Sequence, residues 1–119
     1  KQHLDALAAQ VREIRGVRVL AARVEASGFE ALREQSDWLR DRLGSAIIVL
    51  GALASEKPAF VVVVTPDLVA KGYKAGDIVR KVAAATGGSG GGRPELAQAG
   101  GKDASKLDEA LVLVAGMVS

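Results

Sequence analysis

The chain has 119 residues, 49% hydrophobic and 25% charged, a composition that indicates one folded domain and excludes a disordered segment. It has no cysteine and a single histidine, His3, so disulfides, thiolate metal sites and histidine-based catalytic triads lack the residues they need. The net charge is +2, but residues 71–102 hold six basic and two acidic residues, a local +4 that favours a polyanionic partner. No apolar run is long enough to cross a bilayer, and a cytoplasmic location is compatible.

The first predicted element is a helix over residues 1–15, ended by Gly16. The pattern fits the end of a helical stalk from an upstream domain, a dimerisation helix, or a helix packed on its own domain. Because the chain begins with Lys1 inside this pattern, we expect a fragment, divided into a stalk end (1–15) and a globular domain (16–119). Four apolar side chains, spaced by three, four and three residues, define the helix face: Leu4, Leu7, Val11 and Ile14.

The next elements are predicted from apolar periodicity and from the glycine and proline residues between them. Two near-continuous β-branched stretches predict buried strands joined as an antiparallel hairpin. The final helix begins at a capping box, Ser105 to Asp108, with Asp103 as a second cap. The sequence predicts an α/β domain with a small mixed β-sheet flanked by helices. The predicted elements are strands at Val17–Val24, Ala46–Leu53 and Ala59–Thr65 and helices at Phe29–Leu43, Asp77–Thr86 and from residue 105.

Residues 87–101 hold seven of the fourteen glycines, in a segment predicted as an ordered loop between two helices. Such density suits close approach of another molecule to the backbone, whose N–H groups can surround a phosphate. Arg93 offers a bidentate fork and Gln98 an amide for a ribose or base edge. The structural alternative is a tight turn that lets two helices approach. The candidate nucleic-acid-binding residues are Gly88, Gly90, Gly91, Gly92, Arg93, Gln98, Gly100, Gly101, Lys102, Lys71 and Lys74.

No catalytic set emerges from the remaining polar residues. Gly101-Lys102 is followed by Asp103 where a P-loop requires Ser or Thr, and the segment does not fit the G-x-G-x-x-G dinucleotide fingerprint. The acidic residues of 30–41 recur at helical spacing beside arginines, which predicts a salt-bridged outer face. We expect no catalytic residue and no metal site in this chain.

The segment GGSGGGRPELAQAGGKDASKLDEAL, residues 87–111, resembles the glycine-rich segment that ends bacterial alanyl-tRNA synthetases, as does Tyr73–Val79. This resemblance implies a DHH-associated domain, a class shared with phosphoesterases that carry a histidine where this chain has Arg93. It also implies a C-terminal domain that follows the aminoacylation and editing domains and binds the outer corner of tRNA(Ala). It implies as well that the chain can dimerise through this region, as family members can. ATP, Mg and Zn are implied for the parent enzyme, with no cofactor in this segment.

Three functions follow. The leading one is the tRNA-binding module of an alanine–tRNA ligase, with tRNA and the other domains of the same chain as partners and no membrane. The second is the substrate-binding half of a DHH phosphoesterase. The third is an oligomerisation module, a possible homodimer, whose glycine loop is purely structural.

Overall fold

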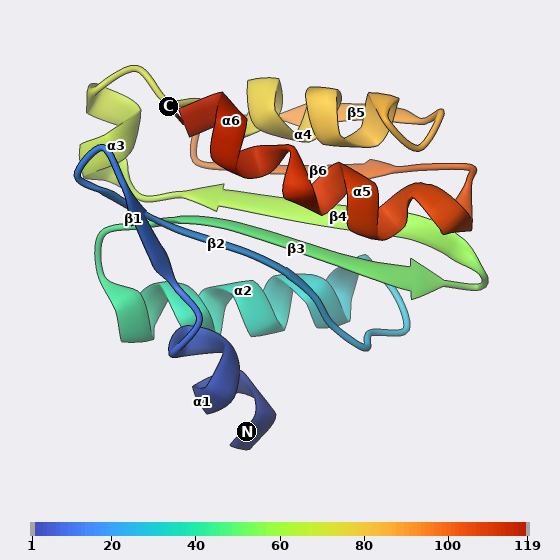
Figure 1. The fold of residues 1–119 in the computed structure, drawn as a ribbon, viewed down its shortest axis with the longest axis horizontal. Coiled ribbons are helices and arrows are strands. Elements are labelled where there is room, and N and C mark those ends of the chain that lie inside the picture. The colour runs from blue at the N-terminus through green and yellow to red at the C-terminus, as the bar shows by residue number, and fades with distance from the viewer. Residues whose placement is uncertain (1, 119) are drawn as a thin grey trace.

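A computed structural model of the chain describes residues 2–118 and shows a six-stranded sheet between two layers of helices (Figure 1). The strand order is β1-β2-β3-β4-β6-β5, with β2 and β3 parallel and every other neighbouring pair antiparallel. The predicted mixed α/β sheet is therefore confirmed. The elements are α1 (Gln2–Ala8), β1 (Arg12–Ile14), β2 (Val17–Arg23), α2 (Phe29–Leu43), β3 (Ile47–Ala54), β4 (Lys57–Val64), α3 (Pro66–Ala70), α4 (Ala75–Ala84), β5 (Ser89–Gly92), β6 (Leu96–Gly100), the 3-10 turn η1 (Ala104–Lys106), α5 (Leu107–Val112) and α6 (Val114–Val118).

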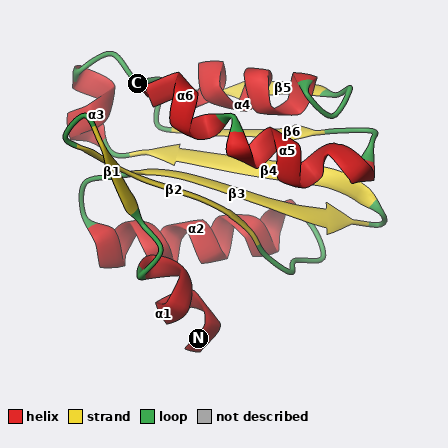
Figure 2. Cartoon of the chain, in the orientation of Figure 1, coloured by secondary structure: helices red, strands yellow, loops and turns green. Residues whose placement is uncertain are grey.

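The two faces of the sheet carry separate apolar cores. On one face α2 packs against β3 and β4, and α1 packs beside α2 (Figure 2). On the other face α4, α5 and α6 cover the sheet. The central strands β3 and β4 are buried on both faces, which explains why their sequences are apolar without alternation. They form the predicted antiparallel hairpin, closed at Ser55 and Glu56, which both have positive φ.

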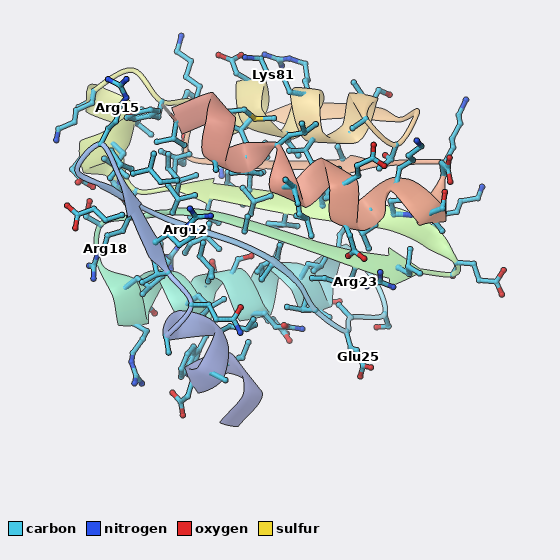
Figure 3. The ribbon with its side chains drawn as sticks, in the orientation of Figure 1. Arg12, Arg15, Arg18, Arg23, Glu25 and Lys81 are labelled. Carbon is cyan, nitrogen blue, oxygen red and sulfur yellow. The ribbon has the colours of Figure 1, made fainter. Side chains whose placement is uncertain are left out.

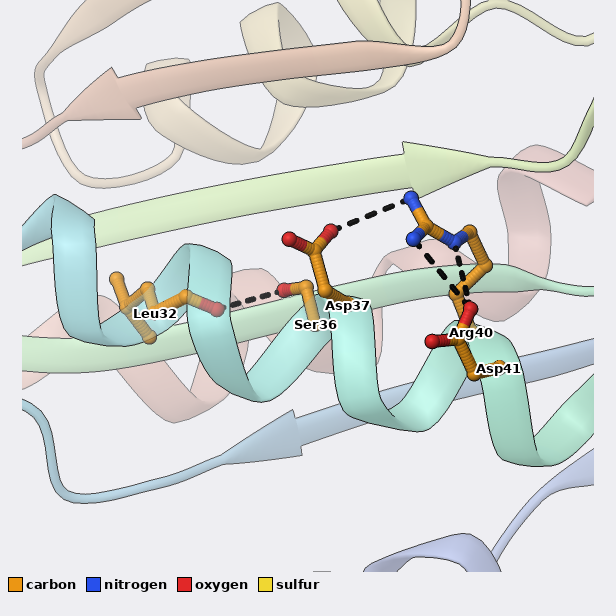
Figure 4. A network of polar contacts seen from close by, with 5 residues as sticks. All are labelled: Leu32, Ser36, Asp37, Arg40 and Asp41. Atoms are coloured by element: carbon orange, nitrogen blue, oxygen red, sulfur yellow. Dashed lines mark hydrogen bonds and ion pairs between the residues drawn. The ribbon is translucent and has the colours of Figure 1, made fainter.

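Helix α2 has the predicted bounds, and its buried stripe includes Leu32, Leu39 and Leu43. The buried Ser36 hydroxyl donates to the Leu32 carbonyl, which satisfies the hydroxyl inside the helix. On the outer side Arg40 pairs with Asp37 and with its neighbour Asp41 (Figure 4). The predicted salt-bridged face of this helix is therefore present at Asp37 and Asp41.

The N-terminal helix is shorter than predicted, because it ends at Ala8 and is followed by strand β1. Arg15 and Gly16 both adopt positive φ and form a two-residue turn that pairs Ile14 with Val17. Val11 and Ile14, the second half of the apolar heptad, therefore lie beyond the helix. Lys1, at which the predicted helix began, lies outside the described residues.

The glycine-rich segment is a β-hairpin, which corrects the prediction of a loop between helices. β5 and β6 pair antiparallel, and β6 joins the sheet through β4. Sequence patterns missed both strands because glycine and alanine are poor strand formers, although Ala97 and Ala99 alternate inward on β6.

The helices around the hairpin also differ from the predicted bounds. α4 begins at Ala75, and α3 lies inside the predicted connector. Asp103, the second predicted cap, accepts a hydrogen bond from the Ser105 amide, so η1 begins there and the Ser105 capping box does not form. No helix of residues 2–118 combines the length and the hydropathy needed to cross a membrane.

Candidate nucleic-acid interface

The β5–β6 hairpin forms one edge of the sheet, with β5 outermost and packed against α4. Two main-chain hydrogen bonds fix its turn: the Ala75 amide donates to the Pro94 carbonyl at 2.7 Å, and the Val64 amide to the Glu95 carbonyl at 3.1 Å. The turn is therefore attached to the start of α4 and to the end of β4. The glycine-rich segment is ordered by pairing on both sides.

Most glycines of the hairpin are required by packing. A Cβ at Gly88 would lie 1.9 Å from the Gly100 carbonyl oxygen, and one at Gly90 would lie 2.3 Å from the Ala99 Cβ. At Gly92 the nearest atom would be the Leu96 carbonyl oxygen, 2.6 Å away, and at Gly101 the Thr86 hydroxyl, 1.9 Å away. The close approach that the glycine density predicts is thus, at these four positions, an approach of the chain to itself.

Several main-chain N–H groups in and directly after the glycine-rich segment already have acceptors inside the protein. The Gly88 amide donates to Ala83, the Arg93 amide to Leu96 and the Gly101 amide to Pro58. The amides of Lys102 and Asp103 both donate to the Thr86 carbonyl. At these positions the main chain therefore offers no free N–H group to an anion.

The basic side chains of the candidate site gather at the turn end of the hairpin. Arg93 is 70% exposed and lies 3.4 Å from a Glu95 carboxylate oxygen. Lys74 is exposed and directly precedes Ala75, whose amide holds the turn, so Lys74 and Arg93 flank the same hydrogen bond. Lys71, also exposed, follows α3 at the same end. The structure brings these three predicted residues to one end of the molecule.

Two other predicted residues lie apart from this group. Lys102 is exposed at the far end of the hairpin. The four residues of β5 separate it from Arg93 by about 13 Å or more. Gln98 is exposed on β6 and lines a shallow groove with Phe29 and Arg33 of α2. Gln98 therefore belongs to the α2 face of the sheet rather than to the α4 face.

Sequence reasoning missed two basic residues at this edge. Arg80 pairs with Asp77, and its guanidinium lies 3.4 Å from the position of a Cβ on Gly91, so it reaches the glycine strand. Lys81 projects from the exposed side of α4 (Figure 3). The sequence placed both residues on the outside of a helix, but only the fold shows that this helix borders β5.

Two carboxylates, Asp67 and Asp103, accept hydrogen bonds from neighbouring groups of the chain. The Ser45 and Thr65 hydroxyls donate to Asp67 and lower the pKa of that carboxyl below its ordinary value. The Ser105 hydroxyl and amide lower the pKa of Asp103 in the same way. No group of three or more metal-binding side chains lies together within residues 2–118.

Comparisons with known proteins agree with this architecture. Residues 16–119 match the DHHA1 domain family. The chain is 50% identical over 114 residues to an alanine–tRNA ligase of Dehalococcoides mccartyi and 52% identical over 111 residues to that of Geobacillus thermodenitrificans. These matches cover 96% and 92% of the chain but 13% of each relative, so the chain spans a small part of their length.

Two solved structures share the fold. The crystal structure of the C-Ala domain from Aquifex aeolicus alanyl-tRNA synthetase superposes with a TM-score of 0.81 at 28% identity, covering 92% of this chain and 98% of that one. A DHH-domain protein described as a member of the s1p family of ribosomal proteins gives a TM-score of 0.61 at 17% identity, over 98% of this chain and 29% of that one. The second likeness shows the fold alone.

Proposed function

The chain belongs to the DHHA1 domain family, in the form found in alanine–tRNA ligases, and from this premise we propose that it is the C-terminal tRNA-binding module of such an enzyme. In this proposal it contacts the elbow of tRNA(Ala) and helps the aminoacylation and editing sites of the same chain share one tRNA. The module acts by binding and carries no catalytic residue of its own. It works in the cytoplasm, with α1 as the end of the stalk that connects it to those domains.

The observation that carries the proposal is the basic end of the hairpin beside a strand with almost no side chains. Lys71, Lys74 and Arg93 lie there, and Arg80 reaches the strand from α4. Lysine and arginine contacts to phosphate supply most of the affinity of a protein for nucleic acid. A strand of three glycines and Ser89 leaves its main chain accessible to an RNA backbone.

We infer that the RNA backbone lies along β5, between the basic end and Lys102. The separation of about 13 Å or more exceeds the spacing of neighbouring phosphates, so the contacts would fall on several phosphates of one strand. Aromatic residues make up only 3% of the chain, so recognition rests mainly on backbone shape and charge rather than on aromatic stacking.

Binding of fluorescently labelled tRNA at low salt tests the proposal. The wild-type chain should bind, and Arg93→Ala combined with Lys102→Ala should weaken binding because both ends of the path lose a cation. A chain that does not bind tRNA at low salt, or whose affinity is unchanged by the double substitution, contradicts it. Sedimentation in the same buffer tests the alternative of an oligomerisation module, for which a tight dimer indifferent to tRNA is expected.

A further inference from the structure

A groove of about 320 Å³ lies between α2 and the turn of the β5–β6 hairpin. Its floor is apolar and includes Val63 of β4, Pro66 of α3 and Leu96 of β6. The groove is open here because α2 packs over β3 and β4, while Leu96 on the neighbouring strand is only partly buried. A volume near 300 Å³ is at the lower limit of small-molecule pockets and suits one planar group rather than a long ligand.

The rim of the groove carries two basic and two acidic side chains. Arg40 and Asp37 come from α2, and their side chains face one another (Figure 4) at 3.2 Å. Arg93 and Glu95 come from the hairpin turn and lie 3.4 Å apart. All four side chains are between 42% and 70% exposed, so each keeps hydrogen-bonding capacity toward the groove.

The apolar floor and the mixed charges of the rim indicate which type of ligand the groove can bind. The four charges cancel, so the groove gives no net attraction to a phosphate chain, unlike the lysines on the other side of the turn. Guanidinium planes stack on nucleobases, and an apolar floor supports the opposite side of a base. Carboxylates accept hydrogen bonds from exocyclic amino groups, as they do from the N4 amino group of cytosine. An unstacked nucleobase can pack on the apolar floor, stack on a guanidinium group and donate a hydrogen bond to a carboxylate at the same time.

We propose that this groove binds one unstacked nucleobase of the RNA, and that it prefers a base with an exocyclic amino group over uracil. The inference rests on the proposed RNA-binding function and adds base recognition to it. Arg93 lies between the basic end of the hairpin and the groove, because Lys74 lies on one side of the turn and the groove lies on the other. A nucleotide whose phosphate contacts Lys74 or Arg93 can therefore place its base in the groove.

Uncharged nucleosides test the groove without the phosphate contacts. The isolated chain suits such a test because the C-Ala crystal structure shows a domain of this extent by itself. In amide NMR spectra, millimolar cytidine should shift Leu96, Glu95 and Arg40 saturably, and uridine should shift them less. Asp37→Asn combined with Glu95→Gln should abolish this preference, because the new amide N–H groups can donate to uracil. Equal responses to cytidine and uridine, or shifts confined to other surfaces, overturn the proposal.

A second test fills the groove and measures RNA binding. Leu96→Trp places a large side chain over the floor, and Val112→Trp is the control, because Val112 is 75% exposed on α5, which covers the opposite face of the sheet. The wild-type chain should bind tRNA about tenfold more tightly than a fully paired RNA duplex of equal charge. Leu96→Trp should remove this discrimination and keep the salt dependence, and Val112→Trp should change neither.

The outcomes separate the two proposals. Retained discrimination in Leu96→Trp refutes the base groove and leaves the tRNA-binding function standing. If no variant binds tRNA or duplex, the proposed function fails, and the nucleoside spectra still decide whether the groove takes a base.

Discussion

Replacing Gly90 by alanine should destabilise the domain by about 2 kcal/mol, because the added methyl group has no space. Its Cβ would lie 2.3 Å from the Ala99 Cβ and 2.4 Å from the Ala99 Cα. Carbon atoms in contact sit about 3.5–4.0 Å apart, so β5 must move by about 1 Å or more relative to β6. For a domain of this length a loss of 2 kcal/mol corresponds to a fall in Tm of about 8 °C. Urea denaturation and thermal melting measure both quantities.

Two other glycines provide the controls. Gly91 is the next residue of β5, and a Cβ there would lie 3.4 Å from the end of the flexible Arg80 side chain, so Gly91→Ala should change the stability by less than about 1 kcal/mol. Gly116 lies in helix α6 with no atom within 4 Å of its added Cβ, so Gly116→Ala should stabilise the domain by about 0.5–1 kcal/mol. If Gly90→Ala is no more destabilising than Gly91→Ala, the steric explanation of the glycine strand is wrong.

Three further predictions concern the rest of the fold. The folded-state pKa of Asp67 is lowered. Its contribution to the free energy of unfolding is therefore fully present above the unfolded-state pKa and is lost as the pH falls through the folded-state pKa. Wild type and Asp67→Asn should therefore differ in urea midpoint at pH 7, and the difference should begin to shrink below about pH 4 and vanish below the lowered folded-state pKa; a constant difference would refute the linkage. Leu39→Ala should cost about 2–5 kcal/mol, since Leu39 is fully buried, and a loss below 1 kcal/mol would contradict the core assignment. Asp103→Ala should increase hydrogen exchange at the Ser105 amide, whose acceptor it removes, and unchanged exchange would argue against the cap.

The fold was predictable where side chains carry a clear pattern. Helix α2 has a regular apolar stripe ended by Gly44, and β3 and β4 are rich in β-branched residues, so periodicity and propensity agree. The β5–β6 hairpin lacked such a pattern, because three of the four residues of β5 have no side chain. In β1, the apolar Ile14 fits a helical heptad and a short strand equally well, and only pairing with β2 decides between them.

The candidate site was predictable in composition but not in arrangement. All four basic candidates, Lys71, Lys74, Arg93 and Lys102, fall within one basic segment of the sequence. The hairpin nevertheless places Lys102 at the end opposite to the other three. Arg40 was interpretable from sequence as part of a salt-bridged helix face, and its ion pair with Asp37 is present. Arg40 lies across a groove from Arg93 because α2 packs beside the hairpin. The spacing of residues along a helix carries no information about this packing.

The central claim, that the basic end of the hairpin contacts RNA phosphates, is tested most directly by the salt dependence of tRNA binding. The slope of log K against log[salt] should fall in magnitude by about 2 when Lys74→Gln and Arg93→Gln are combined, because each substitution removes about one phosphate contact. The charge-matched control combines Arg12→Gln, from the strand at the opposite edge of the sheet, with Arg42→Gln, from α2, whose side chain pairs with Asp5 of α1. We predict that the control keeps the wild-type slope, and equal slopes for the two double variants would contradict the claim.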